Sequence, residues 1–371
     1  MGLSVLIMKK QNLTVDLNDR SYEIIIASGG VKTNQSFFSS FVQNKKCFII
    51  SDSNVFPLYG EQVIANLKQS NGIISGHFVF PAGESSKTLS TVEKIYHETL
   101  KCELDRSSVI IALGGGVVGD IAGFVAATYM RGIDFIQIPT SLLAMVDSSV
   151  GGKTGVDMPE GKNLIGAFWQ PKLVVIDPDT LHTLTMREIK GGLAEVVKYG
   201  VILDSSFFDE LAGGIQKINI LDSEFYSKII ATCCGLKAEV VKQDEKETGL
   251  RGILNYGHTF AHAIETVSGY ESYIHGEAVS IGMLMAGELA CLMNMMKRSE
   301  LDKLISLCRK LDLCIKADGL DTNAVFEAMS KDKKVKDGNV CFVLPKQIGK
   351  VSIISDADKG LVLEAIKKYI S

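Results

Sequence analysis

Short, nearly continuous runs of apolar residues follow one another through the first half of the chain, separated by stretches of helical character. Such runs are typical of strands buried on both faces, and helices between successive strands favour a largely parallel sheet. Segment 89–102 is typical of the connecting helices. We therefore predict an α/β fold with strands at 22–27, 47–52, 76–81, 108–115, 134–139 and 172–177.

The pattern changes near residue 183. Longer segments, such as 276–296 and 299–313, carry apolar residues at helical spacing. Two strand candidates, 340–345 and 350–355, precede a C-terminal helix. The sequence thus predicts two domains, a Rossmann-like α/β domain over residues 1–182 and a mainly α-helical domain over residues 183–371.

Composition narrows the class of protein. The 371 residues are 46% hydrophobic, which is enough for two ordinary domain cores. The net charge of −4 provides no basic surface for nucleic acid. The apolar run 108–130 approaches the length of a membrane span, but it contains Asp120 and five glycines. We expect a buried strand, a tight turn and a helix there, and no membrane partner.

The cysteines and the first residues of the chain indicate the cellular compartment of the protein. Eight cysteines are scattered without a C-x-x-C motif, and only Cys233 and Cys234 are adjacent. The apolar segment 3–8 precedes its lysines, which is the reverse of the order in a secretory signal. We expect a reducing, cytoplasmic setting in which the cysteines serve as small apolar residues.

A glycine-rich turn follows the predicted strand at 108–115. Gly114, Gly116 and Gly119 match the pattern G-x-G-x-x-G. Glycine lets the backbone approach a phosphate closely, and the start of the following helix favours negative charge. A tight strand–helix turn without any ligand is the alternative.

Polar residues also follow other predicted strands. Asp52 and Asn54 stand where a carboxylate could hold a ribose hydroxyl, or they form a turn. Glu84 and Lys87 follow the next strand, and a solvated loop pair is the alternative there. Together, polar groups at several strand ends favour a dinucleotide site.

Three of the six histidines lie close together in the sequence: His258, His262 and His275. The first two share a helix face, but the residue after the first is a threonine, not the Glu of the H-E-x-x-H zinc motif. A catalytic zinc usually has three protein ligands, so these histidines and a carboxylate are candidates. Glu195 has Lys198 on the same helical face, which an ordinary salt bridge would also explain.

The stretch 145–171 has little helical or strand periodicity, so we predict a long functional loop. It places four polar residues among glycines: Asp147, Lys153, Lys162 and Asn163. They could hold phosphate or carboxylate groups, or the lysines could be solvated. Arg131 is a further anion-binding candidate, with a solvated helix end as the alternative, and we expect the single tryptophan, Trp169, to serve packing.

Segments 114–178, 191–200, 246–265 and 275–283 together resemble the signature of the 3-dehydroquinate synthase family, in the same order. The resemblance runs from about Tyr22 to the C-terminus. It implies a homodimeric, NAD-dependent, zinc- or cobalt-requiring carbon–oxygen lyase of the shikimate pathway. That enzyme converts 3-deoxy-D-arabino-heptulosonate 7-phosphate into 3-dehydroquinate and phosphate.

The resemblance also implies site residues. The metal ligands would be Glu195, His258 and His275. Proton transfer is implied for His262 and Glu247. Substrate-pocket positions match Arg131, Asp147, Lys153, Lys162, Asn163, Lys198, Lys237, Arg251 and Asn255, with one of Lys333 and Lys334. NAD would be held by Asp52, Asn54, Glu84, Lys87, Gly115, Gly116, Asp120, Thr140, Ser141, Thr180 and Thr183, with Asp147, Lys153 and Lys162 close to the cofactor.

Three other functions compete with this expectation. A sister sugar-phosphate cyclase would share NAD, the metal and most of the cations, although Lys153, Arg251 and Asn255 favour a substrate with a carboxylate. A zinc-dependent polyol dehydrogenase would accumulate NADH and would not need so many anion-binding residues. An NAD- or metal-binding regulator would not need the complete set of implied ligands.

Overall fold

The computed structural model describes residues 10–31, 36–269, 272–330, 335–336, 339–355 and 357–370. Contacts divide the chain into two compact units. Unit 1 is the chain up to Leu184 together with Ser223–Glu245, and unit 2 is Thr185–Asp222 together with the chain from Lys246. A single boundary near residue 183 does not account for Ser223–Glu245, which belongs to unit 1 although it follows that boundary in the sequence.

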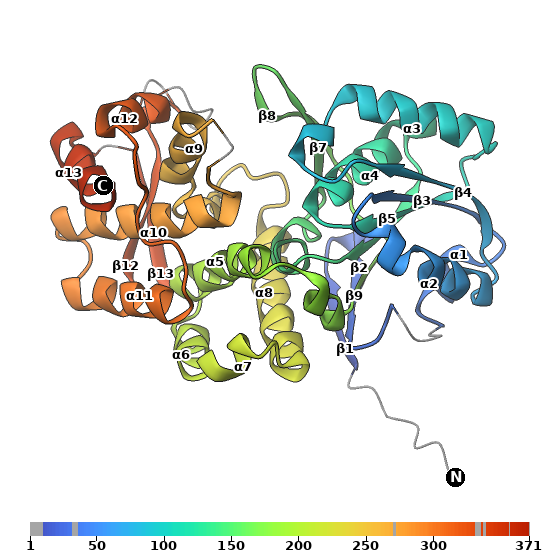
Figure 1. Ribbon diagram of the computed structural model, residues 1–371, viewed down its shortest axis with the longest axis horizontal. Coiled ribbons are helices and arrows are strands. Elements are labelled where there is room, and N and C mark those ends of the chain that lie inside the picture. The colour runs from blue at the N-terminus through green and yellow to red at the C-terminus, as the bar shows by residue number, and fades with distance from the viewer. Residues whose placement is uncertain are drawn as a thin grey trace, which may run out of the picture. The chain divides into compact units, whose positions relative to one another are not determined.

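Among the described residues, the main sheet of unit 1 has seven strands in the order β1-β2-β9-β6-β5-β3-β4 (Figure 1). All neighbouring strands are parallel except β1 and β2. All six predicted strands are present, and β1 is an addition. The strands are β1 (Lys10–Val15), β2 (Tyr22–Ala27), β3 (Lys46–Asp52), β4 (Ile73–Phe80), β5 (Val109–Gly114), β6 (Asp134–Pro139) and β9 (Leu173–Ile176).

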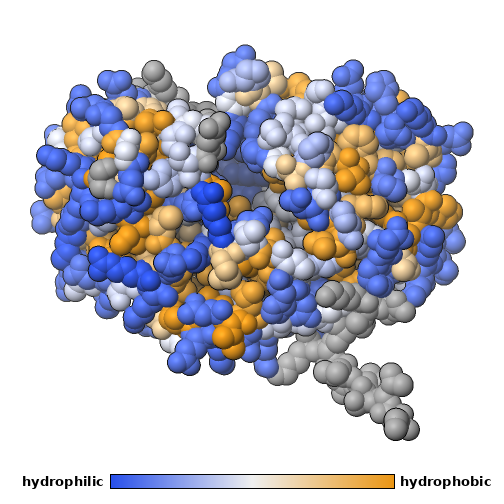
Figure 2. Space-filling model, viewed as in Figure 1, coloured by the Kyte–Doolittle hydropathy of each residue, from blue (hydrophilic) through white to orange (hydrophobic). Residues whose placement is uncertain are grey.

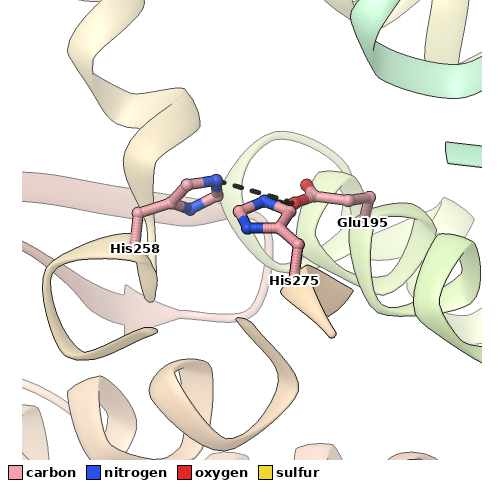
Figure 3. A group of neighbouring side chains, drawn as sticks. All are labelled: Glu195, His258 and His275. Atoms are coloured by element: carbon pink, nitrogen blue, oxygen red, sulfur yellow. Dashed lines mark ion pairs between the residues drawn. The ribbon is translucent and has the colours of Figure 1, made fainter. Parts of the chain in front are cut away.

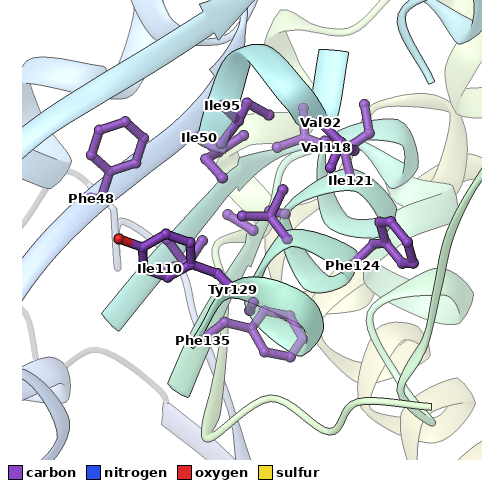
Figure 4. Packing of buried hydrophobic residues seen from close by; sticks show 14 of the residues in the cluster. Phe48, Ile50, Val92, Ile95, Ile110, Val118, Ile121, Phe124, Tyr129 and Phe135 are labelled. Atoms are coloured by element: carbon purple, nitrogen blue, oxygen red, sulfur yellow. The ribbon is translucent and has the colours of Figure 1, made fainter. Parts of the chain in front are cut away.

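Helices cover both faces of this sheet, which explains the nearly continuous apolar strands. Phe48 and Ile50 of β3 face the core cluster under α3 and α4, which Figure 4 shows, whereas Cys47 and Ile49 face the cluster under α2. Each face thus receives every second residue of the strand. The helices of unit 1 are α1 (Ser39–Val42), α2 (Phe56–Gln69), α3 (Leu89–Lys101), α4 (Gly116–Thr128) and α8 (Ser223–Gln243).

The strand order reverses between β3 and β5, because β4 lies outside β3 while β6 lies on the other side of β5. In open parallel sheets such a reversal leaves a crevice outside the carboxyl ends of the strands, where ligands bind. Asp52 ends β3, Gly115 follows β5 and Thr140 follows β6. The fold therefore brings three predicted NAD residues to one edge of the sheet.

The predicted long loop at 145–171 is wrong. After a short helical segment η5 (Ala144–Ser148), β7 (Lys153–Met158) and β8 (Gly161–Phe168) form an antiparallel hairpin. Its strands approach so closely that a Cβ on Gly166 would lie 2.1 Å from the Thr154 carbonyl oxygen. Trp169 packs against the core and donates from Nε1 to the Ile133 carbonyl at 3.0 Å, as its expected packing role requires.

Helix α8 explains the division of the chain. It packs against β1, β2, η5 and the short helix η6 (Pro178–Thr183), all in unit 1. Its Ser223 hydroxyl donates to Asp179 at 2.6 Å. The chain therefore leaves unit 2 for one helix and then returns to it.

Unit 2 is built around α10 (His275–Leu292), whose residues are buried on all sides. The two predicted late strands are present as β12 (Phe342–Gln347) and β13 (Lys350–Ile354), which pair as an antiparallel hairpin, and β12 packs on α10. The short strands β10 (Val335–Lys336) and β11 (Asn339–Val340) form a second antiparallel pair. The other helices are α5 (Met186–Ile202), α6 (Ser205–Gly213), α7 (Ile215–Asn219), α9 (His258–Val267), α11 (Arg298–Lys310), α12 (Thr322–Ser330) and α13 (Lys359–Tyr369), with the short helix η7 (Leu250–Asn255).

Over the described part of the chain, no helix has the length and apolar character to cross a membrane. The run 108–130 instead forms β5, the turn and α4, as expected. All eight cysteines have free thiols. On the face shown in Figure 2, hydrophilic residues are spread over the surface and interrupted by hydrophobic areas.

Candidate active site

The glycine turn of unit 1 has the geometry of an anion site. Helix α4 starts at Gly116, and its N-cap, Gly115, supplies no side-chain cap. The N–H groups of the first turn and the positive end of the helix dipole therefore point to the carboxyl edge of the sheet. Gly114 is required for packing, because a Cβ there would lie 2.4 Å from Val118.

A buried lysine gathers three other predicted residues beside this turn. Lys87 Nζ lies 2.5 Å from Asp120 Oδ2, 2.6 Å from Asn163 Oδ1 and 3.8 Å from Glu84 Oε1. Burial lowers the pKa of Lys87, but Asp120 and Glu84 outweigh it and raise this pKa. Burial raises the pKa values of Asp120 and Glu84. The structure thus places a fixed cation next to the first turn of α4.

Asp52 forms a turn, which was the alternative to a contact with a ribose hydroxyl. Its Oδ1 accepts from the N–H groups of Asn54, at 2.8 Å, and Val55, at 3.0 Å. Both bonds use the same oxygen, so this turn fixes the carboxylate without excluding a ribose contact.

The remaining predicted NAD residues of unit 1 also take part in local bonds. Thr140 N donates to Gly114 O at 3.0 Å, and Ser141 Oγ accepts from Ala144 N at 3.3 Å. Thr183 Oγ1 lies 2.8 Å from the Tyr59 hydroxyl. Thr180 Oγ1 donates to Asp177 O at 2.8 Å. Asp147 is bound by Lys237, a predicted substrate residue, whose Nζ donates to the Asp147 carbonyl at 2.7 Å and pairs with the Asp147 carboxylate.

Arg131 is not brought to this edge. It follows α4 at the end opposite to Gly115 and is exposed. The 13 residues of α4 rise by about 1.5 Å each, so about 20 Å of helix separates Arg131 from the glycine turn. Lys153, at the start of β7, is exposed, and Lys162 lies on β8 of the same hairpin, half-buried.

Unit 2 contains the one group of three or more possible metal ligands found among the described residues: Glu195, His258 and His275. Their ligand atoms all lie within 4.8 Å of one another. Figure 3 shows the three side chains, from α5, α9 and α10, pointing toward a common point. Glu195 is completely buried, and its Oε1 lies 3.6 Å from His258 Nε2 and 3.5 Å from His275 Nε2.

These distances fit a divalent transition metal. Ligands at about 2.0–2.1 Å from a tetrahedral zinc lie about 3.3–3.4 Å from one another. His258 Nδ1 lies 3.1 Å from the Tyr256 carbonyl, which leaves Nε2 directed at the carboxylate. Burial lowers the pKa of His275, but Glu195 and Glu265 outweigh it and raise this pKa to about 10. The same negative groups would favour a bound cation.

Two close backbone contacts bring the three helices together. A Cβ on Gly276 would lie 2.1 Å from the Gly191 carbonyl oxygen, so α10 meets α5 one turn before Glu195. A Cβ on Gly282 would lie 2.2 Å from the Gly257 carbonyl oxygen, so α10 meets the start of α9. Only glycine permits such approaches. The metal ligands thus lie beside contacts that set the helix separations.

The start of α10 is also held by charge. Arg187 of α5 donates from Nε and one terminal nitrogen to Glu277, at 2.7 Å each, and to the Ser272 carbonyl at 2.9 Å. Glu277 in turn accepts from Ile274 N at 3.0 Å. This bidentate pair fixes the first turn of α10, which carries His275, against α5.

His262 lies beside the metal ligands but outside their group, with its ring centroid 5.8 Å from that of His258 and 6.5 Å from that of His275. Lys198, which is buried, pairs with Glu195 as the salt-bridge alternative anticipated. Asn255 Nδ2 donates to Glu247 Oε1 at 2.8 Å. Arg251, on η7, is also buried, and Lys333 and Lys334 lie outside the described residues.

Sequence reasoning missed Glu265, whose carboxylate contacts His275. A signal was present, because His258, His262 and Glu265 stand at i, i+4 and i+7 and so share one face of α9. The glycines at 191, 257, 276 and 282 were also not identified as positioning residues.

Comparisons with known proteins agree with this geometry. Residues 77–191 match the family described as "3-dehydroquinate synthase N-terminal". Residues 192–335 match the family described as "3-dehydroquinate synthase C-terminal". A 3-dehydroquinate synthase from Microcystis aeruginosa is 46% identical over 356 residues, which are 95% of this chain and 97% of that protein.

Two solved structures have the same fold. One is 2-epi-5-epi-valiolone synthase from Streptomyces hygroscopicus subsp. jinggangensis 5008 with NAD⁺ and Zn²⁺ bound, 28% identical, with a TM-score of 0.87 and coverage of 95% of this chain and 98% of that one. The other is 2-deoxy-scyllo-inosose synthase complexed with carbaglucose-6-phosphate, NAD⁺ and Co²⁺, 26% identical, with a TM-score of 0.86 and coverage of 97% and 100%. By its sequence, its fold and its two family matches, the chain belongs to the 3-dehydroquinate synthase family.

Proposed function

We propose that this chain converts 3-deoxy-D-arabino-heptulosonate 7-phosphate into 3-dehydroquinate and inorganic phosphate, as a carbon–oxygen lyase of the shikimate pathway. The observation that carries the proposal is the cluster of Glu195, His258 and His275, in a chain that the family matches cover from residue 77 to residue 335. NAD and one divalent cation, zinc or cobalt, are its cofactors. The solved cyclases with NAD⁺ and Zn²⁺ or Co²⁺ bound support this assignment.

Glu195, His258 and His275 would hold the cation. When bound, it supplies a Lewis acid that lowers the pKa of a substrate alcohol and stabilises negative charge on oxygen. The residues of unit 2 prepare the site: the Tyr256 carbonyl orients His258, and Lys198 holds one oxygen of Glu195. Because Glu195 is completely buried, this carboxylate is shielded from competing water.

NAD would lie along the carboxyl edge of the sheet in unit 1. When bound, NAD⁺ supplies a transient acceptor for a hydride of the substrate alcohol, without net oxidation. The resulting ketone acidifies the neighbouring proton, whose loss expels phosphate. The first turn of α4 and Lys87 would bind its phosphates, and Asp52 would bind a ribose hydroxyl. Seven further residues and one segment would complete its site: Asn54, Glu84, Gly115, Gly116, Asp120, Thr140 and Ser141, with the Thr180–Thr183 segment.

The substrate carries a carboxylate and a phosphate, and both need fixed cations or amides. Lys198 and Arg251 supply buried cations in unit 2, and Asn255 supplies an amide whose orientation Glu247 fixes. Five residues of unit 1 also match the implied substrate positions: Asp147, Lys153, Lys162, Asn163 and Lys237. His262 and Glu247 would hold and move protons at the reacting carbons and oxygens.

We further propose a cytoplasmic homodimer. The eight free thiols support a reducing compartment. Arg131 supports the dimer, because it lies at the far end of α4 from the glycine turn, and a second copy of the chain could bring it to a substrate pocket.

A phosphate-release assay tests the function against its alternatives. Purified protein with NAD⁺ and Zn²⁺ or Co²⁺ should release inorganic phosphate from the heptulosonate phosphate without accumulating NADH. NADH formed in stoichiometric amounts would instead support a polyol dehydrogenase. Faster turnover of a seven-carbon or six-carbon sugar phosphate without a carboxylate would support a sister cyclase.

A further inference from the structure

We propose that Glu265 is a positioning residue, which orients His275 so that its Nε2 meets Glu195 and a bound divalent cation. This inference rests on the proposed metal site of the same cluster. Glu265 lies on α9 and is 4% exposed, and its Oε1 lies 3.5 Å from His275 Nδ1. The imidazole of His275 therefore spans two carboxylates, with Glu195 at Nε2 and Glu265 at Nδ1.

The two histidines of the cluster differ in what orients them. His258 is fixed by a backbone carbonyl two residues before it, so its orientation follows from the local chain. His275 is the first residue of α10, and its side chain is 33% exposed against 11% for His258. The neighbouring N-cap, Ile274, has no side chain that could hold the ring. Its orientation therefore depends on a side chain from another helix.

A carboxylate suits this task. An imidazole that coordinates a metal through one nitrogen carries its proton on the other, and a carboxylate acceptor fixes that tautomer and raises the basicity of the ring. Glu265 also offsets part of the positive charge that a divalent cation and Lys198 would bring to this site.

The geometry of α9 links the two histidines. Glu265 and His258 are seven residues apart on one face of this helix, so the helix that supplies one ligand also supplies the support for the other. Displacing α9 would therefore disturb both imidazoles at once. This coupling distinguishes a positioning role for Glu265 from simple packing.

The test is the affinity of the full-length protein for Zn²⁺, measured by competition with a chromophoric chelator, together with the visible absorption of the Co²⁺ form. We expect Glu265→Ala to weaken Zn²⁺ binding by about 10- to 100-fold and to change the Co²⁺ spectrum. Glu265→Gln keeps an oxygen acceptor at nearly the same volume, so it should recover most of the affinity.

The matched control is Glu288→Gln, which alters another buried glutamate of unit 2 that pairs with Arg298 and Lys368 instead of a histidine. It should lower stability and leave Zn²⁺ affinity unchanged. Should Glu265→Ala fail to fold, Glu265→Gln and Glu265→Asp carry the comparison. Wild-type Zn²⁺ affinity in every Glu265 variant, or an equal loss in Glu288→Gln, overturns the inference. Absence of phosphate release by the wild-type protein would instead overturn the proposed function, whatever the metal affinities.

Discussion

The two units position their functional residues in different ways. In unit 1 the residues stand at the carboxyl ends of parallel strands, where the strand order alone gathers them at one edge. In unit 2 the metal ligands come from three helices, and their meeting depends on backbone contacts at Gly276 and Gly282. Unit 1 thus derives its site from sheet topology, and unit 2 derives its site from helix separation.

This difference predicts how each unit tolerates change. A strand-end site loses one contact when one side chain is replaced, because the sheet still places the others. A site between closely packed helices is lost when the helices move apart, even if every ligand remains. Three variants probe this contrast, and a fourth tests an ion pair that holds the helices of unit 2 together.

The largest effect should follow from removing the buried ligand. Glu195→Ala takes away the one carboxylate of the cluster, so bound zinc and activity should fall together, with kcat/KM lower by about three orders of magnitude. The measurements are metal content after dialysis and phosphate release. Glu188→Ala is the control on the same helix: it removes a capping-box residue, so it should cost about 1 kcal/mol of stability and no metal. Stoichiometric zinc in Glu195→Ala would remove this ligand assignment.

Next in size is a variant that keeps all three ligands. Gly276→Ala places a methyl group 2.1 Å from the Gly191 carbonyl oxygen, so α5 and α10 must separate. We expect a loss of about 1–3 kcal/mol in unfolding free energy and weaker zinc binding. Gly213→Ala, with nothing within 4 Å of the added Cβ, should instead leave both unchanged or add slightly to stability. Unaltered zinc affinity in Gly276→Ala would show that the helix separation does not set the site.

In unit 1 a single side chain should have a local effect. Lys87→Met removes the cation beside Asp120 and the first turn of α4, so the dissociation constant for NAD⁺ should rise by about tenfold or more. Zinc affinity should not change. Lys45→Met is the control, because Lys45 pairs with Asp134 at the amino ends of β3 and β6, away from the proposed cofactor edge. Equal NAD⁺ affinities in the two variants would argue against the edge as the cofactor site.

The smallest effect concerns pH. Burial raises the pKa of Glu288, but Arg298 and Lys368 outweigh it and hold this pKa below its usual value. The carboxylate therefore stabilises the folded state at pH values above the pKa that Glu288 has in the unfolded chain. This contribution is lost as the pH falls through the lower pKa that Glu288 has in the folded protein. Tyr369 also contacts this carboxylate, at 3.4 Å. Urea unfolding of Glu288→Gln should show lower stability than wild type at pH 6 and a difference that shrinks toward pH 3. A difference independent of pH would contradict the assignment.

The strands of unit 1 could be predicted because their apolar runs are bounded by polar or glycine residues, as at Asp52 and Gly114. The hairpin at 153–168 could not, because glycines such as Gly155 and Gly166 remove the alternating side chains that indicate a strand. Strand β1 has only one buried residue in six, so it gives little apolar signal.

The metal site of unit 2 could also be predicted only in part from the sequence. Spacing alone left His258 and His262 as an equally possible metal pair, and only the resemblance to the family selected His258 and His275. The structure supplies a physical reason, since His275 starts a helix that glycine contacts hold against both α5 and α9. The helical spacing places Glu265 on one face of α9 with His258, but its contact with His275 joins two helices, which the spacing within one helix does not encode. The assignment of α8 to unit 1 depends on contacts between segments distant in sequence.

The metal site is tested most directly by the position of the metal in crystals of the zinc-loaded protein, located by anomalous diffraction at the zinc absorption edge. We expect one strong peak, about 2.0–2.2 Å from a carboxylate oxygen of Glu195 and from Nε2 of both His258 and His275. A peak held instead by His258 and His262, with His275 turned away, would contradict it.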